Sequence, residues 1–320
     1  MKNKVLITAP LLRFPDLIKI AEKYFSVEIY EYMPYAELKK QIYKYDGLLI
    51  NARIKFDNEL INKASKLRAV FSPTIGYDHV DLKSLNDSHI NFSAIGLESE
   101  FRKTLWSTAE HALTLMLNVY RNIKPMNFEV ENNFSWDNRK FFFNDIRNST
   151  VGIIGFGNIG RKLCALLRPF ECKILYYDPY VDLSVNNDFN VRKVSLHELL
   201  KMSDIVSLHT PLNDETKHLI NHQEFSLMKP NSVIINTSRG GVINELAFIS
   251  AIENKIIWGG AFDVLENESP FGVEHSALVN FAKKNQNILI TPHVGGSSND
   301  YLHKIFLYSI EKLSMMLNNQ

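Results

Sequence analysis

Short runs of β-forming residues alternate with segments of helical spacing along most of this chain. In the first 72 residues the runs are KVLIT, VEIYE, DGLLI and RAVFS. The alternation resumes after TVGIIGFG with KILYYD, DIVSLH, SVIINT, IIWGGAFDV and NILIT. This rhythm is typical of parallel sheets whose strands are joined by covering helices. The sequence therefore predicts an α/β fold with doubly wound parallel sheets.

The length and composition narrow the class of protein. A chain of 320 residues is long enough for two compact domains, and 45% hydrophobic with 22% charged residues excludes a disordered chain. Its 36 basic and 35 acidic residues create no global field that would attract nucleic acid or a membrane surface. We therefore expect no nucleic-acid partner and no membrane partner, so that any anion is bound by local groups.

The apolar segments and the cysteines indicate the compartment. The apolar run near the N-terminus stops at Pro10, and no run reaches the roughly 20 residues that a membrane-spanning helix needs. Cys164 and Cys172 lie in a helix-then-strand pattern, where they are typical of small hydrophobic residues in a reducing environment. We expect a cytoplasmic protein with no bound metal.

A glycine-rich turn lies between an apolar strand and a helix in VGIIGFGNIGRKL. Gly155 permits the tight turn, Gly157 lets the backbone approach a pyrophosphate, and Gly160 allows the helix to pack closely. The N–H groups at the start of that helix, at Asn158 and Ile159, point toward the phosphates in such a turn. The motif in this context predicts a dinucleotide-binding site.

Asp178 ends the next apolar strand, KILYYD, and follows the last glycine of the motif by 18 residues. An acidic residue at about this spacing binds the hydroxyl groups of the adenosine ribose. Because its carboxylate would repel a ribose phosphate, the sequence predicts NAD rather than NADP as the cofactor.

Three ionisable residues follow later strands at turns, namely Arg239 in NTSRGG, Glu268 in FDVLENESP and His293 in TPHVGG. An arginine at the end of a buried strand is costly to desolvate without a partner, so Arg239 implies an anion that meets it. Each of the three residues alone is more often structural or solvated. Together, and downstream of a dinucleotide-binding turn, they predict a catalytic site beyond the carboxyl ends of the strands.

Over nearly its whole length the sequence resembles the D-isomer-specific 2-hydroxyacid dehydrogenase family, which includes D-lactate, D-glycerate and 3-phosphoglycerate dehydrogenases. The segments that carry the resemblance are GYDHVDL at 76–82, STAEHALTLML at 107–117, GIIGFGNIG at 152–160, HTPLNDET at 209–216, MKPNSVIINTSRGGVINE at 228–245, GGAFDVLENESP at 259–270 and TPHVGGSS at 291–298. The resemblance implies an NAD-dependent oxidoreductase that interconverts a 2-keto acid and a D-2-hydroxy acid, and it implies a homodimer.

The resemblance also implies how the chain is divided. We expect a Rossmann NAD-binding domain at 103–295, inserted into a flavodoxin-like substrate-binding domain formed by 1–102 and 296–320. The helix that starts near Thr104 is a candidate dimer contact. Residues 124–148 show no clean periodicity and are expected to form a surface excursion.

By the same resemblance Arg239, Glu268 and His293 match the catalytic trio of the family. Arg239 would hold the substrate carboxylate and polarise the adjacent keto oxygen. His293 would protonate the developing alkoxide and remove that proton in the reverse direction. Glu268 would hold the imidazole in the useful tautomer and stabilise its protonated form.

The resemblance assigns further contacts to the cofactor and the substrate. Asp263 would bond the nicotinamide carboxamide, and the backbone N–H groups of Ile75 and Gly76 would grip the substrate carboxylate. Glu110 and His111 are adjacent on a helix and are expected to be structural. The other positions along the cofactor are Thr108, His209, Thr210, Pro211, Thr237, Ser238, Gly295 and Gly296.

The substrate side chain is left open by the sequence. Arg53 and Lys55 follow the strand DGLLI, where they either hold a second anionic group or are solvated loop charges. The candidate substrates include 3-phosphoglycerate, hydroxypyruvate and glyoxylate, and a phosphorylated or dicarboxylic one fits the first alternative. The chain departs from the family pattern at Thr74, which replaces a glycine, and at Ser269, which replaces a proline that here stands at Pro270.

Two other functions fit the same scaffold. An NAD(H)-sensing binding module with little turnover, like the C-terminal-binding corepressors, shares the fold and the trio. Formate or phosphite oxidation is the second, but the formate dehydrogenases of the family carry a glutamine where Glu268 stands. Turnover of a 2-keto acid with NADH separates the enzyme from the binding module.

Overall fold

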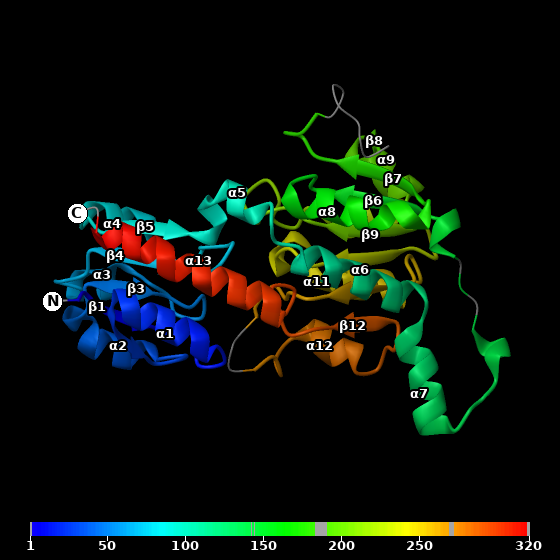
Figure 1. Cartoon of the computed structure of the whole chain (residues 1–320). Coiled ribbons are helices and arrows are strands. Elements are labelled where there is room, and N and C mark those ends of the chain that lie inside the picture. Colours follow the sequence, from blue (N-terminus) through cyan, green and yellow to red (C-terminus); the bar gives the residue numbers. More distant parts are fainter. Residues whose placement is uncertain (1, 142, 144, 183–190, 269–271, 319–320) are drawn as a thin grey trace. The chain divides into compact units, whose positions relative to one another are not determined.

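The computed structural model describes residues 2–141, 143, 145–182, 191–268 and 272–318. The chain divides into two compact units, one formed by 1–105 with 298–320 and the other by 106–297 (Figure 1). Each unit has its own parallel sheet and its own apolar core, and each is described below by itself.

The unit formed by 1–105 and 298–320 is built on a five-stranded parallel sheet in the order β2-β1-β3-β4-β5, which is the order of flavodoxin-like folds. Its strands are β1 (Lys4–Ile7), β2 (Ser26–Ile29), β3 (Gly47–Leu49), β4 (Ala69–Ser72) and β5 (Asn91–Ala94). Its helices are α1 (Pro15–Tyr24), α2 (Tyr35–Gln41), α3 (Asn58–Lys63), α4 (Leu82–Asp87), α5 (Ser99–Arg102) and α13 (Asn299–Asn318), with short 3₁₀ turns η1 (Ile42–Lys44) and η2 (Ile95–Leu97).

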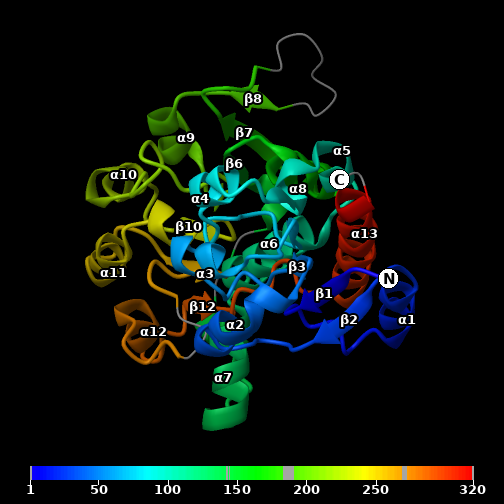
Figure 2. The same cartoon turned by 90° about the vertical axis from the view of Figure 1, so that its left-hand side faces the viewer.

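Helix α13 brings the end of the chain back to this first unit. Its residues Ile305, Ile310 and Leu313 are fully buried and pack in one core cluster with Leu17 of α1 and Val5 of β1. Figure 2 shows α1 and α13 side by side on one face of the sheet. A separate cluster, which includes residues of α2, α3 and α4, fills the other face.

The unit at 106–297 is built on a seven-stranded parallel sheet in the order β12-β11-β10-β9-β6-β7-β8. Its strands are β6 (Thr150–Ile154), β7 (Lys173–Tyr177), β8 (Arg192–Lys193), β9 (Ile205–Leu208), β10 (Val233–Asn236), β11 (Gly259–Phe262) and β12 (Ile288–Ile290). Counted within the unit, this is the Rossmann order with one additional strand at the β12 edge. The order reverses between β6 and β9, which is where such sheets bind their ligands.

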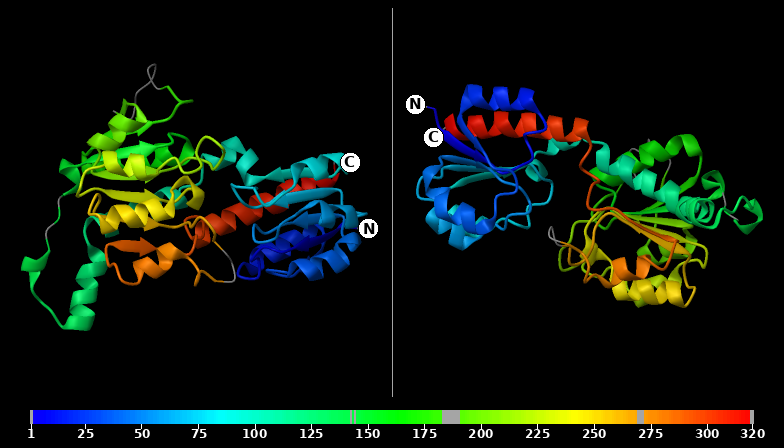
Figure 3. Two further views of the ribbon diagram at one scale, coloured as in Figure 1. Left: turned by 180° about the vertical axis from the view of Figure 1, so that it is seen from behind. Right: turned by 90° about the horizontal axis from the view of Figure 1, so that it is seen from below.

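Helices cover both faces of this second sheet (Figure 3). One core cluster contains residues of α6 and α8, and the other contains residues of α9, α10, α11 and α12. The helices are α6 (Ser107–Tyr120), α7 (Ile123–Asn133), α8 (Asn158–Leu167), α9 (Leu196–Met202), α10 (His222–Leu227), α11 (Glu245–Glu253) and α12 (Ala277–Ala282), with 3₁₀ turns η3 (Asn138–Lys140), η4 (Ile146–Asn148), η5 (Arg168–Phe170) and η6 (Gly240–Val242).

The two parallel sheets confirm the predicted α/β fold, with a Rossmann unit inserted into a flavodoxin-like one. Helix α7 at Ile123–Asn133 lies within the predicted surface excursion at 124–148, and none of its residues is buried. The sequence did not predict that this part is helical, because no apolar stripe of helical spacing marks it. Among the described residues no helix is long and apolar enough to cross a membrane.

Candidate active site

The glycine turn joins β6 to α8 as the spacing predicts. Gly155 has a φ of +89°, a conformation that other residues rarely adopt. A Cβ atom on Gly160 would lie 2.3 Å from the carbonyl oxygen of Gly155, so only glycine lets the helix pack this closely. A Cβ atom on Gly157 would meet nothing within 4 Å, and Gly157 is the residue before the first turn of α8. The turn therefore keeps an open space at a helix N-terminus, which fits a pyrophosphate.

Asp178 lies beside this turn because β7 pairs with β6, with Tyr177 opposite Ile154. Its Oδ2 atom accepts a hydrogen bond of 2.8 Å from the N–H of Phe156 within the glycine turn. Its Oδ1 atom accepts from the N–H groups of Tyr180 and Val181 at 2.9 and 3.1 Å. The carboxylate is thus fixed at the carboxyl end of β7, next to the glycine turn.

Polar atoms without a hydrogen-bond partner lie at the carboxyl ends of β9 and β10. Among the residues described, Nδ1 of His209 and the hydroxyl oxygens of Thr210 and Thr237 are buried without a hydrogen-bond partner. Such atoms are rare in folded proteins unless a ligand satisfies them. Pro211 continues this loop after β9, and all three residues with unsatisfied atoms belong to the set predicted to line the cofactor. Their donors and acceptors fit a polar dinucleotide at this edge of the sheet.

His209 is held in its neutral form by its surroundings. Burial of the imidazole lowers its pKa to about 3, and its Nε2 atom lies 2.9 Å from Oγ of Ser207. The backbone of His209 also approaches the glycine turn, since a Cβ atom on Gly155 would lie 2.8 Å from its carbonyl carbon. His209 therefore offers the site a neutral ring rather than a charge.

Arg239 follows β10 and is positioned by a buried asparagine. The side chain of Asn236, which is fully buried, donates to the carbonyl oxygen of Arg239 at 3.0 Å. Its Oδ1 atom accepts from both the N–H and the hydroxyl of Ser238, at 3.0 and 2.8 Å. This turn fixes the backbone from which the guanidinium extends, and one guanidinium nitrogen donates to the carbonyl oxygen of Ser238 at 2.8 Å.

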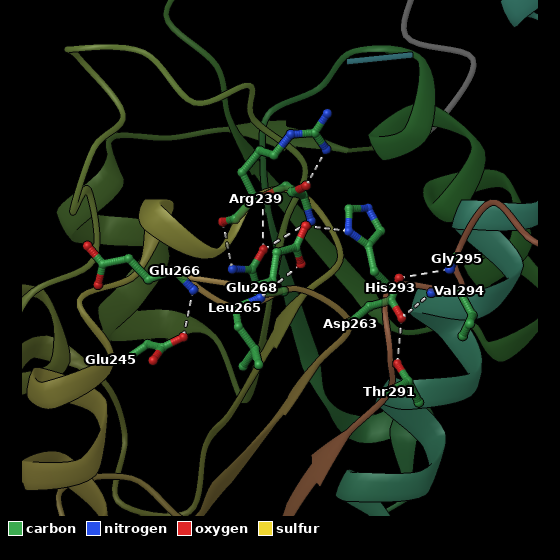
Figure 4. A network of polar contacts seen from close by, with 12 residues as sticks. Arg239, Glu245, Asp263, Leu265, Glu266, Glu268, Thr291, His293, Val294 and Gly295 are labelled. Carbon is green, nitrogen blue, oxygen red and sulfur yellow. Dashed lines mark hydrogen bonds and ion pairs between the residues drawn. The ribbon is translucent and has the colours of Figure 1, made fainter. Parts of the chain in front are cut away.

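His293 and Glu268 form a direct pair. The Nδ1 atom of His293 lies 2.7 Å from Oε1 of Glu268, and both side chains are a little under half exposed. Figure 4 shows this pair with Arg239 at the edge of the sheet where β10, β11 and β12 end. Because Nδ1 bonds to a carboxylate, the neutral ring carries its proton there and has Nε2 available for another group.

Asp263 holds the backbone of the turn that carries His293. His293 has a φ of +54°, in the left-handed region that non-glycine residues avoid. The Asp263 carboxylate accepts from the N–H of Val294 at 2.8 Å, the N–H of Gly295 at 2.7 Å and the hydroxyl of Thr291 at 2.6 Å (Figure 4). These bonds draw the chain around His293 into a tight turn.

The same carboxylate stays ionised although it is only 2% exposed. Burial raises the pKa of Asp263, but the hydrogen bonds from His111, Thr291 and the backbone outweigh it, so the pKa lies below its usual value. Nε2 of His111 lies 3.3 Å from Oδ1 of Asp263 and 3.0 Å from Oγ1 of Thr291. No sequence pattern predicts this long-range contact, since His111 is only one residue of a helical pattern.

The start of α6 lies against the end of the His293 turn. The Ser107 hydroxyl donates to the carbonyl oxygen of Gly295 at 2.8 Å. A Cβ atom on Gly295 would lie 3.4 Å from Cγ2 of Thr108. Thr108 and Gly295 are therefore neighbours, and the partly buried Gly296 is the next residue of the chain.

The four predicted substrate residues belong to the unit at 1–105 and 298–320. Arg53 lies with its guanidinium 4.7 Å from the centre of the Tyr32 ring. Ile75 and Gly76 follow β4, where the Thr74 hydroxyl donates to the carbonyl oxygen of Gly76 at 2.7 Å. Lys55 is exposed. The contacts of these residues with a substrate stay predictions.

Two other sequence expectations concern the loop after Glu268 and a bound metal. Ser269 and Pro270, where the sequence departs from the family pattern, lie outside the described residues. In the part of the chain that the structure describes, no group of three or more histidine, cysteine, aspartate or glutamate residues could hold a metal ion.

A Rossmann unit with an open glycine turn, a carboxylate fixed at the end of the next strand and a histidine–glutamate pair is typical of nicotinamide-dinucleotide oxidoreductases. Comparison with known proteins gives the family. Residues 113–295 match the family described as D-isomer specific 2-hydroxyacid dehydrogenase, NAD binding domain. The chain belongs to this family, and its cofactor is NAD. The predicted resemblance is thereby confirmed.

Individual relatives carry several names. The chain is 32% identical to a D-3-phosphoglycerate dehydrogenase of Methanocaldococcus jannaschii, over 93% of this chain and 54% of that protein. It is 31% identical to a glyoxylate reductase of Thermococcus litoralis, over 94% of this chain and 89% of that protein. The chain thus spans about half the length of the first relative and most of the second.

A solved structure supports the same fold. The D-lactate dehydrogenase of Aquifex aeolicus, complexed with NAD and lactic acid, superposes with a TM-score of 0.84 at 27% identity. The superposition covers 99% of this chain and 96% of that one.

Proposed function

We propose that this protein is an NAD-dependent dehydrogenase that interconverts a 2-keto acid and a D-2-hydroxy acid. The observation that carries the proposal is the 2.7 Å contact between Nδ1 of His293 and Oε1 of Glu268, in a Rossmann unit of this family. A carboxylate at Nδ1 sets the tautomer in which Nε2 can take up a proton and pass it to a substrate oxygen. Because the binding-module alternative shares this pair, turnover of a 2-keto acid is the observation that separates the two functions.

Three side chains divide the chemistry between them. Arg239 binds the substrate carboxylate with parallel N–H donors and polarises the neighbouring keto oxygen. When bound, NADH supplies the hydride to the keto carbon. Protonated His293 donates its Nε2 proton to the oxygen on which negative charge develops, and it removes that proton in the oxidation direction. Glu268 keeps the ring oriented and stabilises the imidazolium.

The cofactor contacts follow from the same edge of the sheet. We propose that the N–H groups at Asn158 and Ile159 bind the pyrophosphate across the open space at Gly157, and that Asp178 binds the adenosine ribose. The unsatisfied atoms of His209, Thr210 and Thr237 are satisfied by the dinucleotide. Remaining contacts are Gly155, Gly160, Pro211, Ser238, Asp263, Gly295, Gly296 and Thr108.

For the substrate we propose a 2-keto or 2-hydroxy acid such as 3-phosphoglycerate, hydroxypyruvate or glyoxylate. The relative from Methanocaldococcus, a D-3-phosphoglycerate dehydrogenase, supports a phosphorylated acid, and the relative from Thermococcus, a glyoxylate reductase, supports a small acid with one carboxylate. Ile75 and Gly76 bind the carboxylate, and for a phosphorylated or dicarboxylic acid Arg53 and Lys55 supply the charge that binds the second anionic group. Arg53→Ala is expected to raise KM for a phosphorylated or dicarboxylic keto acid far more than for pyruvate. Equal effects on all substrates would remove Arg53 from the substrate site.

We also propose a homodimer, and α7 is a better candidate contact than the helix expected from Thr104. Figure 1 shows α7 extending away from the sheet of its own unit. In the segment around it Phe134 and Trp136 are each 91% exposed. Exposed aromatic clusters of this kind mark protein interfaces. Sedimentation of the wild type and of Trp136→Lys tests this, since only the substituted chain should become monomeric. The cytoplasmic location stays a prediction from the sequence.

The direct test of the proposed function is a panel of 2-keto acids with NADH and NADPH. Pyruvate, glyoxylate, hydroxypyruvate and a phosphorylated hydroxypyruvate cover the classes above. We expect oxidation of NADH with at least one of them, and faster turnover with NADH than with NADPH. NADH binding without turnover of any acid would support the binding module instead.

A further inference from the structure

The turn that carries Glu268 packs directly on the loop after β10. A Cβ atom on Gly240 would lie 1.9 Å from the carbonyl carbon of Leu265, so backbone meets backbone with no side chain between. The residues that hold this turn in place therefore also control where Glu268 lies. Two of them, Glu245 and His218, have no part in the proposed reaction.

Glu245 is the first residue of α11 and lies partly buried near the catalytic pair. Its Oε1 atom accepts a hydrogen bond of 2.8 Å from the backbone N–H of Glu266 (Figure 4). Burial of the carboxyl, together with the charge of Glu266, raises the pKa of Glu245. Within the described part of the chain it forms no ion pair with a basic side chain. A carboxyl group at a site that disfavours its charge is costly unless it makes a useful contact. For Glu245 that contact is the hydrogen bond from the N–H of Glu266.

The side chain of Glu266 makes a second contact, in addition to the hydrogen bond of its backbone N–H. Its Oε1 atom lies 2.6 Å from Nε2 of His218, whose own N–H donates to the carbonyl oxygen of Gly241 at 2.8 Å. His218 has a φ of +50°, in the left-handed region that non-glycine residues rarely adopt. Glu266 is thus held by its backbone from α11 and by its side chain from the loop before α10.

Glu268 follows Glu266 by two residues. Its carboxylate contacts His293 through Oε1, while Oε2 lies only at the limit of a hydrogen bond from the N–H of Leu265, at 3.5 Å. That weak contact does little to fix the side chain. The position of Glu268 is therefore determined mainly by the backbone that carries it, which the Glu266 contacts hold.

We propose that Glu245 is a positioning residue that holds the 265–268 turn through the N–H of Glu266 and so places Glu268 against Nδ1 of His293. His218 assists through its pair with the Glu266 side chain. The inference rests on the proposed function for its kinetic consequence, but its structural consequence can be measured without turnover.

The test compares two substitutions of Glu245. Glu245→Gln keeps a carbonyl oxygen that can accept from Glu266, whereas Glu245→Met has similar length and no such acceptor. Glu253→Met, at the exposed end of the same helix, is the matched control. The first readout is the tautomer of His293 in the protein with ¹⁵N-labelled histidine, assigned as the signal missing from His293→Gln.

We expect the neutral His293 ring to carry its proton on Nδ1 in the wild type, in Glu245→Gln and in Glu253→Met. In Glu245→Met the tautomer should shift toward the mixture found in Glu268→Met, which has no acceptor for Nδ1, while the other histidine signals stay in place. A wild-type tautomer in Glu245→Met would overturn the inference, whatever the activity of the protein.

The second readout is kinetic and separates positioning from general loss of structure. Glu245→Met should lower kcat about ten-fold with little change in KM, since misplacing a catalytic group by a small distance costs this much or more. Glu245→Gln should restore most of kcat. In a Glu268→Met background, where the contact with His293 is absent, Glu245→Met should have almost no further effect, because residues that act through one contact are not additive. Equal losses in both backgrounds would contradict the inference, and an inactive wild type would contradict only the proposed function.

Discussion

His293 and Glu268 are 25 residues apart in sequence, yet Nδ1 of the first lies 2.7 Å from Oε1 of the second. They meet because β11 and β12 are adjacent parallel strands, with Phe262 opposite Ile290, and both loops leave the same edge of the sheet. The fold itself therefore brings the imidazole and the carboxylate together, and a catalytic group held in this way needs less reorganisation during the reaction.

The first prediction concerns this pair. Glu268→Gln should lower kcat by about 10²-fold with a much smaller change in KM, because it removes the charge that stabilises the imidazolium in a general acid–base step. Steady-state kinetics with the best keto acid measure it. Glu274→Gln, an exposed position in the segment that follows, is the control and should behave as the wild type. A change confined to KM would show that Glu268 serves binding rather than proton transfer.

The second prediction contrasts two glycines of the same turn. Gly157→Ala places a methyl group in open space, so thermal stability should stay near that of the wild type while Kd for NAD rises about ten-fold or more. Gly160→Ala forces a Cβ atom to within 2.3 Å of the Gly155 carbonyl oxygen. Overpacking of this kind costs about 1–3 kcal/mol, so Tm should fall by several degrees.

Calorimetry and NAD titration of both variants check this contrast. The result that counts against the pyrophosphate site is unchanged NAD affinity in a well-folded Gly157→Ala protein. Equal losses of stability in the two variants would contradict the geometry of the turn.

The third prediction concerns the choice between NAD and NADP. Asp178→Asn keeps one oxygen that can accept from Phe156 or from Tyr180, so the loop should remain folded. It removes the charge that would repel a ribose phosphate. The ratio of kcat/KM for NADH to that for NADPH should fall about ten-fold, which corresponds to about 1.4 kcal/mol. An unchanged ratio would mean that Asp178 does not face the ribose.

The fourth prediction is the acid dependence of stability. The pKa of Asp263 is lowered in the folded protein, so its ionised form stabilises the fold. This contribution is fully present above the unfolded pKa of about 3.9 and is lost as the pH falls through the lower folded value. Asp263→Asn removes this charge-dependent stabilisation. It also replaces one acceptor oxygen by an NH₂ group, which then faces a backbone N–H that has lost its acceptor.

Urea unfolding between about pH 5 and about pH 3 measures this effect. The variant should be less stable than the wild type by about 1–3 kcal/mol at the upper end of the range, where a buried donor is left unsatisfied. The difference should shrink toward the lower end. A difference that is constant with pH would show that the carboxylate is not the stabilising species.

Much of the site could be predicted from the sequence, for a physical reason. Strands of a parallel sheet all end at one edge, so polar residues after strand-like runs must gather there, and Gly155, Asp178, Glu268 and His293 do so. The glycine turn could be predicted because the spacing of its glycines is set by the local backbone geometry. Patterns set by local geometry can be recognised in a single sequence.

The remaining features depend on contacts that no local pattern encodes. His111 contacts Asp263 from a position 152 residues earlier in the chain, and Glu245 contacts the backbone of Glu266 rather than a side chain. The left-handed backbone of His293 is maintained by hydrogen bonds to Asp263 rather than by a glycine. Helix α7 was missed because it buries no residue within its own unit.

The most direct measurement of the central claim is oxidation of paired D- and L-2-hydroxy acids with NAD, by the wild type and by His293→Gln. The account predicts NADH formation from the D-acid only, and a loss of about 10²- to 10⁴-fold in His293→Gln with NAD affinity unchanged. Oxidation of the L-acid, or full activity without the imidazole, would contradict it.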